Sequence, residues 1–133
     1  MLNLSYFDNE RLQSLEPIYL SEHLPQVGSM KINYMFDFHR AIFLLEQPTS
    51  EPLDYIINNE YELLLGRGHY KLNKKRETLI SAGRVIIDKK ITYIDNDSGH
   101  YNPSNEHLKK VILIFRELNL LSDDFSFFCY REE

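Results

Sequence analysis

The stretch that decides the fold runs from Ser81 to Leu121 and reads SAGRVIIDKKITYIDNDSGHYNPSNEHLKKVILIFRELNLL. Two runs rich in β-branched residues, 78–88 and 90–96, flank a polar turn at Asp88-Lys89-Lys90, which predicts a β-hairpin. A dense polar loop, SGHYNPS, follows the second run, and apolar residues at helical spacing follow the loop. The order strand, turn, strand, loop, helix predicts an α+β unit.

The helix is the clearest single element of the chain. Its apolar residues recur at helical spacing, and most of its charged residues lie opposite them. It can begin at Asn102 before Pro103, or at Ser104 with Glu106 in the first turn, and Asn119 can take the left-handed conformation that ends it. The residues expected to face the core are Leu108, Val111, Ile112, Phe115 and Leu118.

Further strands are indicated outside this stretch. Apolar residues alternate over 30–38, and Asn58-Asn59 separates two apolar runs as a hairpin turn would. Residues 8–15 suit a short helix capped by Asp8, residues 125–130 suit a last strand, and residues 41–45 fit a helix or a buried strand equally. We expect one α+β domain over 1–133, in which an antiparallel sheet of two hairpins plus edge strands carries a long C-terminal amphipathic helix and a short N-terminal helix.

Composition narrows the class of partner. With 133 residues, 43% of them hydrophobic, the chain can build one core, and its net charge of −5 opposes nucleic-acid binding. The basic run 71–76 is a local exception that suits a solvated loop or an acidic partner. Nine Tyr and eight Phe without Trp fit a contact surface or the edge of a core.

The sequence also bears on compartment. Cys129 is the single cysteine and cannot form an internal disulfide, and no apolar run reaches the roughly 18–20 residues of a membrane span. The N-terminus lacks the basic segment of a signal peptide. We therefore expect a cytoplasmic protein without membrane contact, with delivery into another cell by a secretion system left open.

The tripeptide Gly-His-Tyr occurs twice, as Gly68-His69-Tyr70 and as Gly99-His100-Tyr101, and each copy follows a predicted strand. Histidine exchanges protons near neutral pH, and an adjacent tyrosine can donate a hydrogen bond or stack on a flat ligand. The alternative is that each histidine only braces a loop. On the catalytic interpretation, His69, His100, Tyr101 and Arg84 act on a substrate.

The loop 95–99, Asp-Asn-Asp-Ser-Gly, leads into the helix and can form a tightly wound anion cradle or a plain turn. On the first interpretation Asn96, Ser98 and Gly99 bind a ligand, together with Tyr70 of the first tripeptide. The spacing of the histidines matches no standard metal pattern, and no metal is predicted.

Several of these segments resemble a known family. SAGRVIID, IDNDSGHYNPS and the helix are similar to the C-terminal domain of plant IQ-motif calmodulin-binding proteins and to C-terminal domains of bacterial polymorphic toxins and effectors. The resemblance covers residues 55–128. It implies that one cluster unites five residues of this chain, namely His69, Arg84, Ser98, His100 and Tyr101.

The chain also departs from the family. The family usually has Gly in the turn where this chain has Lys89-Lys90, and the basic loop 74–77 replaces its glycine-rich run. No IQ-type basic helix is present, so calmodulin binding is not implied.

Two classes of function stay open. The first is an effector- or toxin-type enzyme, either an ADP-ribosyltransferase using NAD or a ribonuclease with His69 and His100 as an acid–base pair. The cofactor is otherwise unknown, and Glu60, Glu62 and Glu77 are the candidate carboxylates for the transferase. The second is a non-catalytic module, an immunity or regulatory protein that blocks a basic partner. In either class we expect a protein partner, namely a toxin, an immunity protein or a host target.

Overall fold

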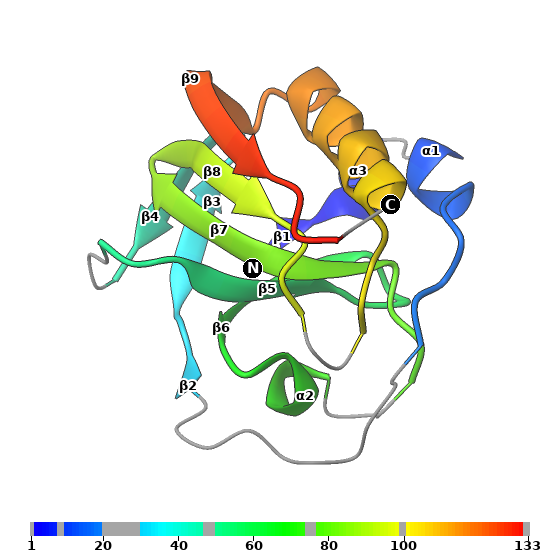
Figure 1. Ribbon diagram of the computed structural model, residues 1–133. Coiled ribbons are helices and arrows are strands. Elements are labelled where there is room, and N and C mark those ends of the chain that lie inside the picture. Colours follow the sequence, from blue (N-terminus) through cyan, green and yellow to red (C-terminus); the bar gives the residue numbers. More distant parts are fainter. Residues whose placement is uncertain are drawn as a thin grey trace.

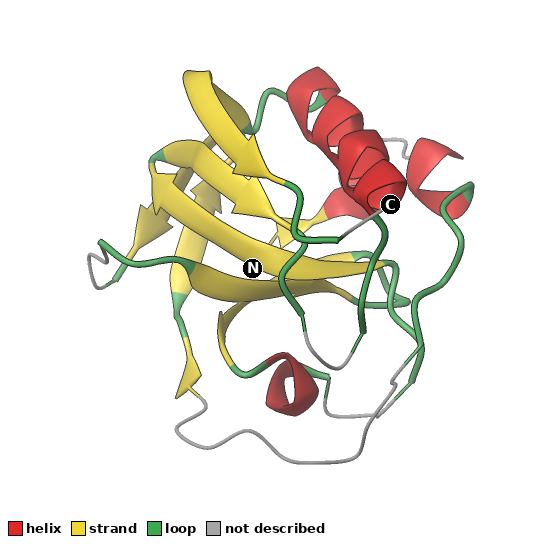
Figure 2. Ribbon diagram, in the orientation of Figure 1, coloured by secondary structure: helices red, strands yellow, loops and turns green. Residues whose placement is uncertain are grey.

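The computed structural model of the chain describes residues 2–7, 10–19, 30–46, 50–73, 77–98 and 101–131. These residues form an α+β fold in which a curved sheet has helices on both faces (Figures 1 and 2). The α+β class is therefore confirmed. None of the helices in this described part is long and apolar enough to cross a membrane.

The main sheet is mixed. Its strands lie in the order β1 (Leu2–Asn3), β6 (Glu62–Arg67), β5 (Leu53–Ile57), β7 (Ser81–Asp88), β8 (Lys90–Asp95) and β9 (Leu121–Phe128), with β2 (Met30–Lys31) also paired to β6. Every pair is antiparallel except β8 and β9, which are parallel. The prediction of an antiparallel sheet is wrong at this edge, because the helix between β8 and β9 returns the chain to the end where β8 began.

Both predicted hairpins are present. The β7–β8 turn places Lys89 at φ 65°, where glycine or asparagine is more usual. The β5–β6 turn spans residues 58–61, but the positive φ, 63°, belongs to Tyr61 and not to an asparagine. Asn58 instead stabilises that turn through its side-chain oxygen, which accepts hydrogen bonds from the backbone N–H groups of Glu60 and Glu62.

The predicted strand over residues 30–38 is divided. Its first part is β2, and its second part, β3 (Tyr34–Asp37), pairs with β4 (Ile42–Leu45) in a separate two-stranded sheet. Residues 42–45 are thus a strand, which settles the alternative left open by the sequence. The buried rings of Phe36 and Phe43, 5.0 Å apart, join this small sheet to the core.

The C-terminal helix, α3, spans Asn105–Glu117, so its 13 residues make it moderate rather than long. Its N-cap is Ser104, whose hydroxyl accepts a hydrogen bond from the backbone N–H of His107 at 3.0 Å. Asn119 has φ 62°, which confirms the left-handed end.

The other helices differ from expectation. Near the N-terminus, the short α1 (Glu10–Gln13) lies within the predicted range 8–15, whose capping Asp8 lies outside the described residues. A 3-10 helix η1 (Leu4–Phe7) precedes it and was not predicted. A further short helix, α2 (His69–Leu72), was not predicted. It occupies the strand-to-loop position of the first Gly-His-Tyr tripeptide.

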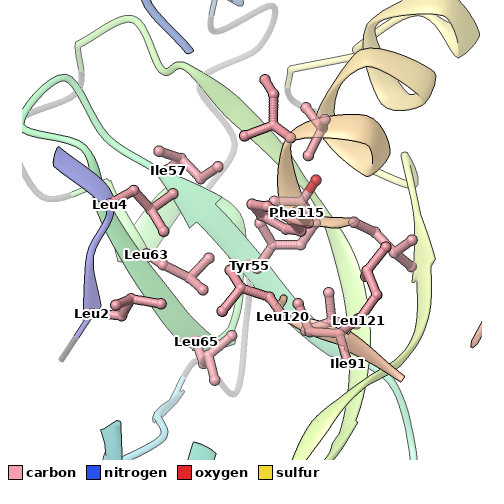
Figure 3. Close-up of a cluster of buried hydrophobic side chains, with 14 of the residues drawn as sticks. Leu2, Leu4, Tyr55, Ile57, Leu63, Leu65, Ile91, Phe115, Leu120 and Leu121 are labelled. Atoms are coloured by element: carbon pink, nitrogen blue, oxygen red, sulfur yellow. The ribbon is translucent and has the colours of Figure 1, made fainter. Parts of the chain in front are cut away.

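The core lies between α3 and the sheet. Phe115 is fully buried and its ring lies 6.4 Å from that of Tyr55 on β5 (Figure 3). Of the predicted helix face, Leu118 is half-buried and the other members are buried, namely Leu108, Val111, Ile112 and Phe115. Each such side chain contributes about 1.5–3 kcal/mol before its entropy is counted.

Helix α2 lies on the side of the sheet opposite α3 (Figure 1), and a second, smaller apolar cluster packs between α2 and the sheet. It includes Tyr101, so this side chain packs against that face and not in the core under α3. The members of the cluster are Ile18, Ile56, Leu72, Leu79, Ala82 and Tyr101.

Candidate functional site

The position of Gly83 on β7 shows to which face of the sheet the neighbouring Arg84 belongs. A Cβ atom at position 83 would lie 2.0 Å from the carbonyl oxygen of Asp95 and 2.9 Å from the Tyr55 ring, so the backbones approach too closely for any other residue. Position 83 therefore faces Tyr55 and α3. Because neighbouring residues of a strand point to opposite faces, Arg84 faces the side away from α3.

A polar network surrounds Arg84 and is centred on the fully buried carboxylate of Asp95. Arg84 donates to this carboxylate from its backbone N–H and from Nε, both at 3.0 Å, and its Nη2 lies 2.9 Å from Oδ2. The Tyr93 hydroxyl donates to Oδ2 at 2.6 Å, and Arg84 Nη2 donates to the Tyr130 hydroxyl at 2.7 Å. We call these four residues, together with Asp97, whose carboxylate lies 3.4 Å from Arg84 Nε, the Asp95 network.

The Asp95 network depends on a register shift between β7 and β8. Ile87 pairs with Ile91, but the next pairs are Ile86 with Tyr93 and Arg84 with Asp95. Without the extra residue on β8, Arg84 would lie opposite Ile94. The irregularity therefore brings the two charged side chains together.

The network changes the protonation behaviour of its members. Burial alone would lower the pKa of the Arg84 guanidinium, but its hydrogen bond to Asp95 and the charges of both carboxylates outweigh burial and raise the pKa. Burial and the hydrogen bond to Asp95 raise the pKa of the Tyr93 hydroxyl. Both groups thus stay protonated near neutral pH and act as hydrogen-bond donors.

His69 is buried, with 2% of its surface exposed. Its Nε2 lies 2.6 Å from the Gly83 carbonyl oxygen, to which it donates, and 3.8 Å from Oδ1 of Asp54. The other carboxylate oxygen of Asp54 accepts from the Gly68 N–H at 2.6 Å, directly before α2. These contacts fasten α2 to the sheet.

Tyr101 is also buried and reaches α2. Its hydroxyl accepts a hydrogen bond at 2.8 Å from the side-chain nitrogen of Asn73, whose own N–H bonds to the carbonyl of His69. Two members of the predicted cluster, His69 and Tyr101, are thus linked through the end of α2, and Arg84 follows the glycine that His69 contacts.

Asn96 and Ser98 hold the chain's own backbone. The Asn96 side chain donates to the Pro103 carbonyl and the Asn105 side chain and accepts from the N–H of Tyr130 at 2.8 Å. The Ser98 carbonyl accepts from Arg131 Nη2 at 3.0 Å. The buried Ser98 hydroxyl has no hydrogen-bond partner among the described residues.

The remaining predicted positions are not placed. Gly99, His100 and the side chain of Tyr70 lie outside the described residues. The pairing of His69 with His100 across one cleft therefore stays a prediction. Within the described ranges, no group of three His, Cys, Asp or Glu side chains is arranged to hold a metal ion.

Comparison of the chain with protein-family models, with curated proteins and with solved structures finds no match. The resemblance to SGHY-containing domains thus rests on the quoted motifs. Within the described residues, Gly83 allows a close approach of β7 and β8, His69 binds the Gly83 carbonyl, and Arg84 pairs with Asp95.

Sequence reasoning missed several members of this site. Asp95 was assigned to the end of the strand 90–96 and the start of the loop 95–99 but not to a charge pair, and neither Tyr93 nor Tyr130 was singled out, although the three side chains surround Arg84. Asp54 was assigned only to a strand. A strand position that holds an isolated carboxylate between apolar residues, as Asp54 does in Leu-Asp-Tyr-Ile-Ile, was the available signal.

Proposed function

We propose that this chain is a non-catalytic protein-binding module of the immunity or regulatory kind, and that its partner is a basic protein. One observation carries the proposal: the three predicted catalytic side chains that the structure describes, His69, Arg84 and Tyr101, are engaged by the chain itself. His69 binds a backbone carbonyl, the Tyr101 hydroxyl binds Asn73, and Arg84 is shared between Asp95 and Tyr130.

Catalysis would require different geometry at these positions. A general base must come within about 2.6–3.2 Å of the proton that it removes, directly or through one water. His69 is buried, and its Nε2 already contacts the Gly83 carbonyl. Arg84 lies between two carboxylates, which offset the positive charge that an anionic substrate would need.

The charge of the chain supports a basic partner. The net charge is −5, and complementary charge speeds association and rejects like-charged competitors. The same charge disfavours nucleic acid, which draws much of its affinity from phosphate neutralisation.

An effector-type enzyme is the second candidate, and the Ser98 hydroxyl favours it. Buried polar atoms without a partner are rare, and a bound ligand is one way of satisfying such an atom. Ser98 directly precedes Gly99 and His100, so a nucleotide such as NAD, or RNA, would be the substrate to test there.

Two measurements separate these candidates. The first is expression of the wild type and of His100→Ala in a bacterial host, with growth recorded, together with incubation of the purified protein with NAD and with RNA. A binding module leaves growth unchanged, releases no nicotinamide and cleaves no RNA. Growth arrest that His100→Ala abolishes, or turnover of either substrate, would contradict the proposal.

The second measurement is selection from a random-peptide phage library against the immobilised protein. A module for basic partners should enrich a family of peptides rich in Lys and Arg. Enrichment of acidic peptides, or of none, would count against it.

A further inference from the structure

The strand β9 ends the sheet and has an open outer side. Among the described strands it pairs only with β8 (Figure 1). Its sequence, LSDDFSFF, contains no Lys, Arg or Pro, although lysine and proline are common means of protecting an edge strand from pairing. The register shift between Leu121 and Ser126 disrupts the first part of the strand, whereas 126–128 pair regularly. Residues 126–128 carry no charge, proline or bulge, and such a strand edge is a template for another strand.

The segment that follows β9 is held in place at several points. The N–H of Tyr130 donates to Asn96 at 2.8 Å, and the N–H of Arg131 donates to Asn105 at 3.0 Å. The Arg131 side chain reaches the Ser98 carbonyl. The edge is thus pre-organised, and ordering it on binding would cost little entropy.

Large aromatic side chains line this edge. Phe127 is 47% exposed and Phe128 is 55% exposed, and as strand neighbours they lie on opposite faces. The ring of Phe128 lies 4.7 Å from that of Tyr130, which links it to the Asp95 network. Exposed aromatic rings bind apolar side chains and the cations of Lys and Arg.

The negative charge of β9 favours a basic segment over a second copy of this chain as the added strand. Asp123 and Asp124 are both exposed, and no basic residue lies in the strand. A second copy in full antiparallel overlap would place Asp124 opposite Phe125 of the other copy and diagonally across from its Asp123 on the same face, and like charges in such cross-strand positions are destabilising. An added strand with Lys or Arg on one face would not suffer this repulsion between like charges.

We infer that the outer edge of β9 is the docking site, and that the partner adds an extended basic segment as the next strand. This inference rests on the proposed function and names its surface and its partner chemistry. The backbone of the added strand would bond to β9, its basic side chains would lie near Asp123 and Asp124, and its other side chains would contact Phe127 and Phe128.

The test uses two synthetic probes, a peptide of alternating Lys and Val and a matched peptide of alternating Glu and Val. Amide chemical shifts of the full chain are followed by NMR as each peptide is added. The Lys-Val peptide should shift the amides of β9 and its flanks, and the Glu-Val peptide should bind at least tenfold more weakly. A Lys-Val peptide with N-methyl groups on alternate amides should lose binding, because it cannot complete a strand ladder.

The matched variants are Asp123→Asn with Asp124→Asn, and Glu10→Gln with Glu16→Gln. Both pairs remove two exposed negative charges, but only the first pair lies on β9. The first pair should weaken the Lys-Val peptide about three- to tenfold, and the second should change its affinity by less than about twofold.

Other results would overturn the inference in distinguishable ways. Shifts confined to another surface, or equal effects of the two double variants, would remove the β9 site but leave a binding module for basic partners. A dimer in solution that the β9 variant alters would make a second copy the occupant. Binding of neither peptide, with no enriched phage family, would remove the site and the proposed function together.

Discussion

His69 and Gly83 are joined by a hydrogen bond of 2.6 Å between the ring Nε2 and the carbonyl oxygen. This contact connects two segments that precede the SGHY loop in the chain, the first Gly-His-Tyr tripeptide, at the start of α2, and the strand β7 with its Ala-Gly-Arg sequence. A carbonyl oxygen accepts but cannot donate, so Nε2 carries a proton. The imidazole therefore serves as a structural brace between α2 and the sheet.

Replacing His69 by Ala should destabilise the fold by about 1–3 kcal/mol, because the Gly83 carbonyl loses its ring partner and α2 loses packing. Chemical denaturation measures the change. His39→Ala is the matched control, since His39 is exposed, and it should cost less than about 0.5 kcal/mol. Equal stability of the two variants would remove the structural role of His69.

Replacing Asp95 by Ala should cost about 3–5 kcal/mol, because it leaves the Arg84 guanidinium without its buried partner. Asp97→Ala provides the comparison. Asp97 also lies within ion-pair distance of Arg84, but its side chain is 44% exposed, and its removal should cost less than about 1 kcal/mol. Urea unfolding of both variants checks the order, and a larger loss for Asp97→Ala would mean that Asp95 is not the centre of the network.

Replacing Phe115 by Ala should cost about 3–5 kcal/mol, because its ring is fully buried against Tyr55. Leu113→Ala lies on the same helix but removes a side chain that is 52% exposed, so it should cost less than about 1 kcal/mol. Thermal unfolding compares the two. A loss well under 1 kcal/mol for Phe115→Ala would show that α3 packs through another face.

Tyr101→Phe tests the SGHY loop. On the catalytic interpretation this hydroxyl would face a substrate, and its loss would leave stability unchanged. Because the hydroxyl accepts a buried hydrogen bond from Asn73, we now expect a loss of about 1–2 kcal/mol. The exposed Tyr19→Phe should be neutral in the same melting experiment. No change for Tyr101→Phe would mean that the hydrogen bond from Asn73 does not contribute to the stability of the fold.

The elements that local pattern controls could be predicted. Helix α3 has an apolar face at helical spacing, a capping Ser104 and a left-handed Asn119, and each acts within a few residues. The parallel pairing of β9 with β8 depends on contacts between distant segments, which periodicity does not report. The β3–β4 hairpin is local, but periodicity does not reveal that it forms a sheet of its own. Helix α2 is a single turn that hydrogen bonds to Asp54 and Gly83 hold in place, so no local sequence pattern predicts it.

The candidate site was predicted by residue type but not by environment. His69, Arg84 and Tyr101 were singled out because they carry chemistry, and the fold buries two of them and pairs the third. Asp95 comes opposite Arg84 through a register irregularity, and strand alternation alone cannot reveal such a shift. The sequence shows which side chains can donate, accept or exchange protons, but it does not show which residues they contact in the fold.

His107 predicts how the stability of the fold depends on pH. It lies in the first turn of α3 with 7% of its surface exposed, and its Nε2 has no hydrogen-bond partner among the described residues. Burial lowers the pKa of this imidazole. The hydrogen bond with the backbone of Ile80 raises the pKa in part, and the charge of Lys110 lowers it further. The folded state thus binds the proton more weakly than the unfolded state does.

The consequence has a definite sign. Above the unfolded pKa of about 6.5, His107 is neutral in both states and does not affect stability. As the pH falls below that value, the unfolded state gains a proton first, and stability decreases until the folded pKa is reached, by at most about 1.4 kcal/mol per pH unit. Urea unfolding from about pH 8 to pH 5.5 should show a smaller loss in His107→Gln than in the wild type. His39→Gln, at an exposed position, should keep the wild-type slope. If His107→Gln also kept the wild-type dependence of stability on pH, protonation of His107 would not destabilise the folded state. A partner or a water molecule would then have to bind the protonated Nε2.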